Sequence, residues 1–169
     1  MTYLELAIAF TLKAEGKFVI DDGGPTMFGV TQHVYYAHRI ANHELTRSVE
    51  LIEPIEVHAI MFYEYWLPAH CDSMPEKLAI AMFDWSYNHG ATGAIVTLQT
   101  CLGVANDGIW GPITATAIPR AATGLVARFL DARRAWYQAA AFENEEKYGK
   151  YLRGWLIRVT QLELYLESI

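Results

Sequence analysis

The sequence predicts a mainly α-helical protein with one short extended and turn-rich segment near residues 17–31. Three observations support this fold class. Apolar residues recur at helical spacing along most of the chain, hydrophobic residues make up 53% of its 169 residues, and no repeat or low-complexity linker divides it. Helical spacing gathers apolar side chains on one face, and a chain of this length can enclose a core. We therefore expect packed helices and not a disordered chain.

The first predicted helix covers residues 2–15. Leu4, Ile8 and Leu12 recur every four residues, and Glu15 follows on the same stripe. A carboxyl group on an apolar stripe is partly desolvated, which favours its protonated form, as a general acid requires. A solvated glutamate at a helix end, capped by Gly16, explains the position equally well. Glu15 is therefore a candidate acid whose assignment depends on the residues that follow.

A glycine-rich bend comes after this helix. Asp21 and Asp22 lie on a short extended piece, and the turn 23–25 returns the chain through Thr26 to Thr31. Glycine adopts backbone conformations closed to other residues, and proline stiffens a turn. Such a bend lets main chain approach a ligand closely, although an ordinary hairpin tip has the same composition. The pattern places acidic residues at a bend next to the first helix.

Two helices are expected between residues 31 and 66. Thr31 is a good N-cap for a short helix to about residue 41. Pro54 suits the first turn of the next helix, which ends near Trp66 because Pro68 prevents its continuation. The last turns are unusually aromatic, and core packing explains most of these rings. Tyr63 and Trp66 are the candidates for stacking against the apolar face of a sugar ring.

The helix predicted over residues 75–89, with Gly90 as a left-handed C-terminal residue, is expected to be central. Asp84 and Asn88 share one face of it, beside Trp85. Polar groups next to large aromatic residues on an apolar helix indicate either a satisfied buried network or the floor of a groove. Asn88 and Trp85 are candidate groove residues, while Asp84 either meets a ligand or caps a neighbouring helix.

The second half of the chain is predicted to be helical as well. Helices are expected over about 91–103, 112–118, 123–145 and 151–166. The loop 104–112 carries the turn Asp107-Gly108 and Trp110, which is interpreted as a plug between two helices. Glu143 to Lys147 are interpreted as a solvated turn between the last two helices.

Charge and composition exclude several classes of protein. A net charge of −6 argues against nucleic-acid binding, which needs Lys and Arg to neutralise phosphates. No apolar run reaches the roughly 20 residues of a membrane span, so we expect no stable membrane insertion. The first ten residues lack the basic start and cleavage site of a secretory signal. We expect a monomer that is made in the cytoplasm.

Metal and redox chemistry are not indicated. The two cysteines, Cys71 and Cys101, form no CxxC or metal-ligand pattern, and the six histidines include no HExxH arrangement. We expect no catalytic metal and no cofactor. Two free thiols are expected, with a disulfide as the alternative if the protein reaches an oxidising compartment.

The residues 21–31, Asp-x-Gly-Gly-x-Thr-x-x-Gly-Val-Thr, together with Glu15-Gly16, resemble the signature of glycoside hydrolase family 108. This family comprises bacterial and phage muramidases with a lysozyme-like fold. The resemblance implies that Glu15 is the catalytic acid and that Asp21 matches the family's aspartate. Lys17 replaces the family's second glycine, and the segment before the Gly-Gly pair is shorter than usual, which leaves Asp22 as an alternative to Asp21.

Later stretches extend the resemblance. Residues 62–66 and 83–90 are similar to the family's Tyr-x-x-Tyr-Trp and Phe-Asp-x-x-x-Asn-x-Gly segments. Residues 98–114 resemble the predicted peptidoglycan-binding region at the C-terminal end of family members. The resemblance therefore implies a lysozyme-like helical fold with a catalytic muramidase region at 1–90 and a peptidoglycan-binding region at 91–169, packed as one compact unit.

The implied reaction is hydrolysis of the β-1,4 bond between N-acetylmuramic acid and N-acetylglucosamine in a peptidoglycan glycan strand. The implied catalytic residues are Glu15, Asp21, Asp22 and Thr26, and the implied substrate-binding residues are Thr31, Tyr63, Trp66, Trp85 and Asn88. A phage endolysin that acts on the cell wall after release fits these properties. The alternatives are a non-catalytic peptidoglycan-binding or secretion-activator protein and a lytic transglycosylase. Retention and inversion stay open, because they depend on the separation of two carboxylates.

Overall fold

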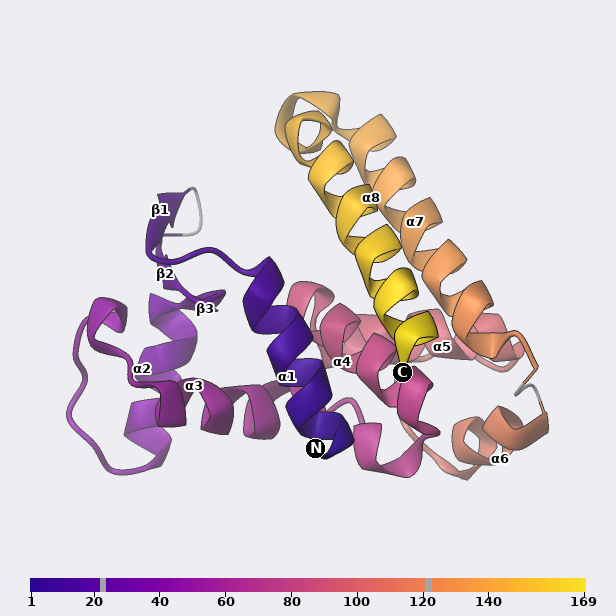
Figure 1. Ribbon diagram of the computed structural model, residues 1–169, viewed down its shortest axis with the longest axis horizontal. Helices are drawn as coiled ribbons and strands as arrows, with labels where there is room; N and C mark the ends of the chain where they lie inside the picture. The colour runs from indigo at the N-terminus through magenta and orange to yellow at the C-terminus, as the bar shows by residue number, and fades with distance from the viewer. Residues whose placement is uncertain (22–23, 121–122) are drawn as a thin grey trace.

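The computed structural model describes residues 1–21, 24–120 and 123–169 and is mainly helical (Figure 1). In chain order the elements are α1 (Tyr3–Ala14), the strands β1 (Val19–Asp21), β2 (Gly24–Met27) and β3 (Val30–Thr31), and the helices α2 (Gln32–Ala41), α3 (Pro54–Ile60), α4 (Glu76–His89), α5 (Ala91–Leu102), α6 (Pro112–Arg120), α7 (Leu125–Glu143) and α8 (Glu145–Ser168). Short 3-10 turns occur at Val49–Leu51 and Cys71–Ser73. None of the helices in these three described ranges is long and apolar enough to cross a bilayer. The predicted mainly α fold class is confirmed.

The only extended structure among the described residues is a small antiparallel sheet in the order β1-β2-β3. Ile20 pairs with Pro25 across the first two strands, and Thr26 pairs with Thr31 across the last two. This sheet is the short extended segment that the glycine-rich bend predicts near residues 17–31. Figure 1 shows it on one side of the end of α1, while the α7–α8 hairpin rises on the other side.

The helix α1 begins and ends as its sequence predicts. Thr2 Oγ1 accepts from the Glu5 amide at 3.2 Å, and the Thr2 amide donates to Glu5 Oε2 at 2.6 Å, which is a capping box. At the other end Glu15 leaves the helix with extended backbone angles, although its amide still donates to the Thr11 carbonyl at 3.0 Å. The last helical bond therefore fixes the backbone of Glu15 while its side chain is carried to the junction with the bend.

The helix α4 is the centre of the core. Its residues from Leu78 to Ser86 are all buried, because α1, α5 and α7 pack around it. Helices enclosed on every side are mostly apolar, and in the buried stretch of α4 only Asp84 and Ser86 are polar. Gly90 ends the helix with a positive φ of 81°, but its ψ of 153° is extended and not left-handed helical as expected. The buried length of α4 makes Asp84 an interior residue.

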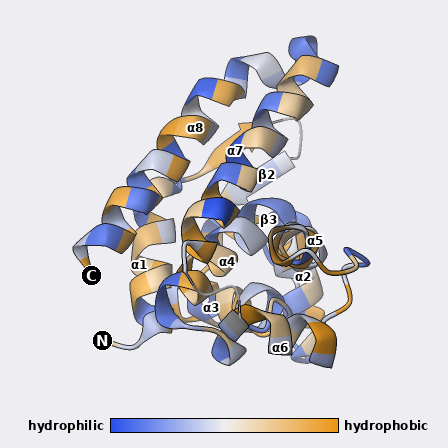
Figure 2. Cartoon of the chain, turned by 90° about the vertical axis from the view of Figure 1, so that its right-hand side faces the viewer, coloured by the Kyte–Doolittle hydropathy of each residue, from blue (hydrophilic) through white to orange (hydrophobic). Residues whose placement is uncertain are grey.

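The last two helices form an antiparallel hairpin. Hydrophobic residues recur turn by turn among hydrophilic ones along α7 and α8, which is the pattern of amphipathic helices (Figure 2). The solvated turn expected at residues 143–147 is shorter than predicted, because α8 already begins at Glu145. Asn144 Oδ1 accepts from the Lys147 amide at 3.0 Å and thereby starts the new helix.

The helix that starts at Pro54 changes its geometry before it ends. Pro54 occupies the first helical position, as expected. After Ile60 the chain continues as a π-helical segment, Met61–Trp66, with one more residue per hydrogen-bonded turn than an α-helix. The segment ends at Trp66, where the sequence predicts the end of the helix. It carries the aromatic residues on to α4, where Trp66 packs against Phe83.

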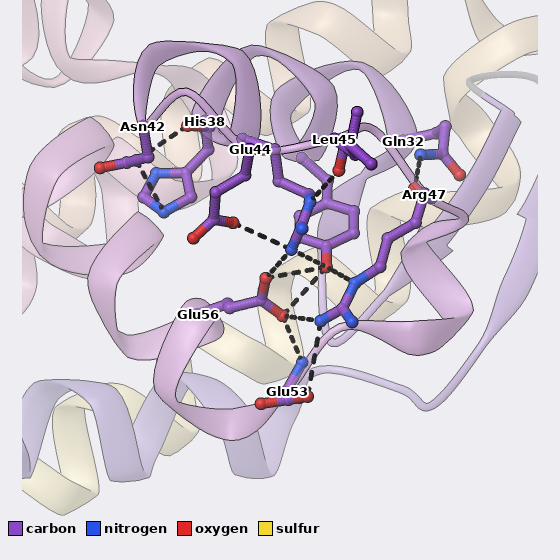
Figure 3. A network of polar contacts seen from close by, with 10 residues as sticks. Gln32, His38, Asn42, Glu44, Leu45, Arg47, Glu53 and Glu56 are labelled. Carbon is purple, nitrogen blue, oxygen red and sulfur yellow. Dashed lines mark hydrogen bonds and ion pairs between the residues drawn. The ribbon is translucent and has the colours of Figure 1, made fainter.

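A polar cluster around the buried ring of Tyr35 ties α2 to α3 (Figure 3). The Tyr35 hydroxyl donates to the Glu56 carboxylate, whose two oxygens lie at 2.9 Å. Arg39 Nη1 lies 2.5 Å from Glu56 Oε1, and Arg47 Nη2 lies 2.8 Å from Glu56 Oε2. We call Tyr35, Arg39, Arg47 and Glu56 the Tyr35 cluster. It holds the loop between α2 and α3 against α3.

Candidate active site

Glu15 lies where α1 gives way to the bend, and its side chain is 19% exposed. Its position therefore agrees with the partial desolvation that the apolar stripe predicts. Glu15 Oε1 lies 2.5 Å from Arg158 Nη1, which comes from α8. The residue at the junction is thus neither a freely solvated glutamate nor a carboxyl group in a purely apolar pocket. It is one half of an ion pair with the last helix.

The glycine-rich bend brings main chain against this carboxylate. Gly29 has a φ of +82°, and a Cβ atom there would lie 2.8 Å from Glu15 Oε2 and 2.6 Å from Tyr87 Cε1. A side chain would have to displace either the acid or the ring, and an L-residue would be strained at this φ. The bend was expected to let main chain approach a ligand, and in the structure it approaches the candidate acid itself.

Two tyrosine rings line the same place. Tyr87 donates its hydroxyl to the Phe28 carbonyl at 2.8 Å, and its ring meets Tyr65 edge to face at 4.7 Å. Burial raises the pKa of both phenols, and the negative charge of Glu15 raises it further. Both tyrosines are therefore neutral at physiological pH and act as walls, and Tyr87 is also a hydrogen-bond donor.

A buried group of charges lies directly behind Glu15. Asp84 Oδ2 accepts from Arg133 Nη1 at 2.6 Å, and Asp84 Oδ1 accepts from Arg158 Nη2 at 2.7 Å and from Thr11 Oγ1 at 3.1 Å. We call Thr11, Asp84, Arg133, Arg158 and Glu15 the Asp84 cluster. It joins α1, α4, α7 and α8. Of the two arrangements that the sequence allowed around Asp84, this is the buried network, in which Arg133 Nε is left without a hydrogen-bond partner.

Asp84 keeps its charge in the interior. Burial by itself raises the pKa of this carboxyl group, but Arg133 and Arg158 outweigh the burial and lower the pKa to about 2. Opposite charges in hydrogen-bond contact favour the ionised form in this way. Asp84 is therefore a permanent negative charge that holds the two arginines, and it does not serve as a proton donor.

The bend residues that the sequence proposes as catalytic are placed as follows. The backbone of Asp21 pairs with Gly24 at the end of β1, while its side chain and the whole of Asp22 lie outside the described residues. Thr26 lies on β2, with its hydroxyl 3.4 Å from the Gly24 carbonyl. Thr31 accepts from the Val34 amide at 3.3 Å and is the N-cap of α2, as expected.

Two of the proposed substrate-binding residues have free surface. Tyr63 is 59% exposed and meets Phe62 edge to face at 5.0 Å. Asn88 is exposed at the end of α4, one helical turn beyond Asp84, and donates to the Asp84 carbonyl at 2.7 Å. These two side chains, unlike the tryptophans, offer atoms that a ligand can reach.

Trp66 and Trp85 lie in the core. Trp66 is 3% exposed and donates to Asp72 Oδ1 at 2.7 Å. Trp85 is fully buried, donates to Thr97 Oγ1 at 3.0 Å and lies under the guanidinium of Arg133. The predicted sugar contacts of these tryptophans require ring surface that neither has, because both indoles are used for packing and both N–H groups are already bonded.

The sequence reasoning missed the two arginines of the Asp84 cluster. The buried positions of α7 include Leu125, Phe129, Arg133, Tyr137 and Ala141, which follow one another by four. An arginine inside such a stripe needs a buried acid as its partner, and this pattern was the available indication. Arg158 has a similar place between Trp155 and Leu162 on α8.

The remaining chemistry is sparse. Cys71 is buried and Cys101 partly buried, and both are free thiols. Within the described parts of the chain, no group of three His, Cys, Asp or Glu side chains is arranged to hold a metal ion. Trp110 stacks on His70 with ring centroids 4.9 Å apart, and its role as a plug between two helices stays a prediction.

A small sheet beside a helical bundle, with a glutamate at the end of the first helix held against a glycine bend, defines a lysozyme-like protein. Residues 8–90 match the family model described as Glycosyl hydrolase 108, and residues 93–160 match the model described as Predicted Peptidoglycan domain. Residues 8–90 thus belong to the glycosyl hydrolase 108 family, and the predicted peptidoglycan domain follows them in the chain. The function of the chain is therefore lysozyme-like and directed at peptidoglycan.

A solved structure shows the same fold. The structure of Brucella abortus SagA superposes with a TM-score of 0.82 at 24% sequence identity, over 98% of this chain and 94% of that one. No curated protein matches the chain. The family matches place Glu15 and Asp84 in the hydrolase region and Arg158 in the peptidoglycan domain. The division of the chain at residue 90 stays a prediction.

Proposed function

We propose that the protein is a muramidase that hydrolyses the β-1,4 bond between N-acetylmuramic acid and N-acetylglucosamine. The observation that carries the proposal is the place of Glu15. The family signature marks this residue, and the structure holds its carboxylate between Gly29, Tyr87 and Arg158 with part of its surface open. A carboxyl group held on rigid elements and still reachable by solvent suits proton transfer to a bound sugar.

In the proposed reaction the carboxyl group of Glu15 gives its proton to the glycosidic oxygen of the leaving sugar. The positive charge that develops on the other sugar is stabilised by a second carboxylate, or that carboxylate orients a water molecule. Asp21 is the first candidate for this role and Asp22 the second, because both lie on the bend after Glu15. Thr26 assists from β2.

The glycan strand is the proposed partner, and the exposed side chains of Tyr63 and Asn88, together with the partly buried Thr31, are its proposed contacts. Tyr63 offers a free ring face for a sugar, and Asn88 offers amide atoms for hydroxyl or acetamido groups. We further propose a monomer that is made in the cytoplasm and reaches the wall after release, in the manner of a phage endolysin.

One observation favours a second function, a peptidoglycan-binding protein without hydrolytic activity. Arg158 contacts Glu15 at 2.5 Å, and a neighbouring guanidinium favours the ionised form of a carboxyl group. A general acid must carry a proton when the substrate is bound. If this ion pair persists in the complex, the protein binds the wall and does not cut it.

Clearing of purified cell walls distinguishes the two functions. The wild type is expected to clear the walls, and Glu15→Gln is expected to lower the rate by at least about 100-fold, because general acid–base groups contribute about 10² to 10⁴. Glu143→Gln is the matched control, since Glu143 is an exposed residue at the end of α7. Both variants should still sediment with walls.

Each outcome of the clearing experiment points to a different conclusion about the function. Equal clearing by wild type and Glu15→Gln shows that the site is elsewhere. Sedimentation of both proteins without clearing establishes the binding protein. Mass spectrometry of the released muropeptides then tests the reaction, because a lytic transglycosylase leaves anhydro ends and a hydrolase leaves reducing ends.

A further inference from the structure

Arg158 donates to two carboxylates at once, one on each side of its guanidinium. Nη1 lies 2.5 Å from Glu15 Oε1, while Nε lies 3.2 Å from both Asp84 oxygens and Nη2 lies 2.7 Å from Asp84 Oδ1. The planar fork of arginine suits this double contact, which the point charge of a lysine cannot reproduce. The side chain is 12% exposed, so it is largely removed from water.

The edge of this guanidinium that contacts Asp84 is held in place, because Asp84 is itself held by other residues. Asp84 is held by Arg133 and Thr11, in addition to Arg158, and its pKa of about 2 keeps it ionised. The Asp84–Arg133 pair is already neutral by itself. The charge of Arg158 is therefore balanced by Glu15, and the four charged groups form a neutral set in which the orientation of Glu15 follows that of Arg158.

We propose that Arg158 is a positioning residue for Glu15 and that the peptidoglycan domain thereby completes the catalytic centre. This role rests on the proposed muramidase function. Arg158 belongs to the 93–160 match and Glu15 to the 8–90 match, so the hydrolase region does not contain all the groups that orient its acid. The peptidoglycan domain acts as a structural part of the active site in addition to any contact with the wall.

The pH dependence of activity reports on this contact, because the neighbours of Glu15 keep fixed protonation states near neutral pH. Tyr65 on the π-helical segment and Tyr87 on α4 stay neutral, since burial raises the pKa of both. Asp84 on α4 stays ionised, and Arg158 on α8 stays charged because Asp84 and Glu15 raise its pKa against the effect of burial. The Gly29 turn offers no titratable side chain. A change in the pH profile of a variant at Arg158 therefore reports on the contact between Arg158 and Glu15.

The test measures wall clearing from pH 4 to pH 9, together with the melting temperature, for Arg158→Gln, Arg158→Lys and the control Arg153→Gln. Arg153 is an exposed arginine of the same helix, so its replacement makes the same change in net charge. We expect Arg158→Gln to lower the rate about 100-fold, as misplacement of a catalytic group by roughly 1 Å does. Its pH profile should also differ from that of the wild type, because the cation that contacts Glu15 is lost.

Arg158→Lys keeps the positive charge and is expected to fold. A loss of activity in this variant therefore cannot be attributed to unfolding. The variant should unfold near the wild-type temperature and keep the wild-type pH limit, yet clear walls about 10-fold more slowly, because an ammonium cannot hold both carboxylates in the same geometry. A purely structural arginine would lower stability and rate without moving the pH limit.

Two results overturn the proposal in distinguishable ways. If Glu15→Gln is inactive while folded Arg158→Gln and Arg158→Lys have the rate and pH profile of the wild type, the muramidase function stands and the role of Arg158 is wrong. If the wild type itself does not clear walls, the muramidase function is wrong and the positioning role is lost with it.

Discussion

The protein contains two clusters in which arginines surround a carboxylate, and they differ in burial and in sequence separation. In the Asp84 cluster, the Arg133 and Asp84 side chains are 0% and 1% exposed, and the two residues are 49 positions apart. In the Tyr35 cluster, Arg47 and Glu56 are 33% and 14% exposed and lie 9 positions apart. The first joins helices from both ends of the chain, while the second fastens a local connection.

The difference in burial determines how much each cluster contributes to stability and to activity. A buried charge loses its hydration, so removing its partner leaves an uncompensated charge in the interior. Water can reach a partly exposed side chain such as Arg47 and replace a lost partner there, so such an ion pair contributes less than a fully buried one. The Asp84 cluster should be essential to the fold and to the site, whereas the Tyr35 cluster should be locally stabilising and separable from activity.

The largest expected effect is that of Asp84→Asn. It leaves Arg133 and Arg158 without their shared anion, and breaking a buried pair costs about 3–5 kcal/mol. Urea unfolding should show a loss of that size. Asp131→Asn is the control, since Asp131 pairs with Arg134 at 2.8 Å but is 73% exposed, and it should change stability little. Equal losses in the two variants would contradict the comparison.

Acid should weaken the wild type through the same carboxylate. The folded pKa of Asp84, about 2, lies below the value of about 3.9 in an unfolded chain. Its stabilisation, about 2.6 kcal/mol, is therefore complete above roughly pH 5 and is lost as the pH falls toward 2. Between pH 7 and pH 3 the wild type should lose about 1 kcal/mol more than Asp84→Asn. Identical pH slopes would show that Asp84 is not held in this way.

The smallest expected effect belongs to Glu56→Gln in the Tyr35 cluster. The amide keeps the shape and part of the hydrogen bonding, so the loss should be about 1 kcal/mol or less. Hydrogen exchange should speed up in the connection between α2 and α3, while wall clearing stays at the wild-type rate. Glu53→Gln, at a residue that is 63% exposed, is the matched control. A loss as large as that of Asp84→Asn would remove the distinction between the clusters.

Much of the fold follows from local sequence. The apolar stripe predicts α1 and places Glu15 at its end. Thr31 and Pro54 mark helix starts that the structure contains, because capping and proline preferences act within one turn. The glycine pattern likewise predicts the bend that β1, β2 and β3 form. Local rules of this kind depend only on neighbouring residues.

The site was predicted only in part, because its completion depends on tertiary packing. Glu15 is recognisable from the motif around it, but Arg158 is 143 positions away and reaches it only once α8 packs on α1. The exposed fraction of Trp66 and Trp85 depends equally on neighbours from other elements. An aromatic residue near a motif fits a core or a sugar subsite equally well until those neighbours are known.

The π-helical segment Met61–Trp66 gives one continuous helix two orientations. Its wider turn offsets the side chains that follow by about 100° relative to a regular α-helix, the angle of one added residue. Val57 and Ile60 are buried before the offset, whereas Tyr65 meets Tyr87 and Trp66 meets Phe83 after it. Deleting a single residue there would restore the regular spiral and turn Tyr65 away from the acid. The number of residues in this segment is therefore as important for the orientation of Tyr65 as the identity of its residues.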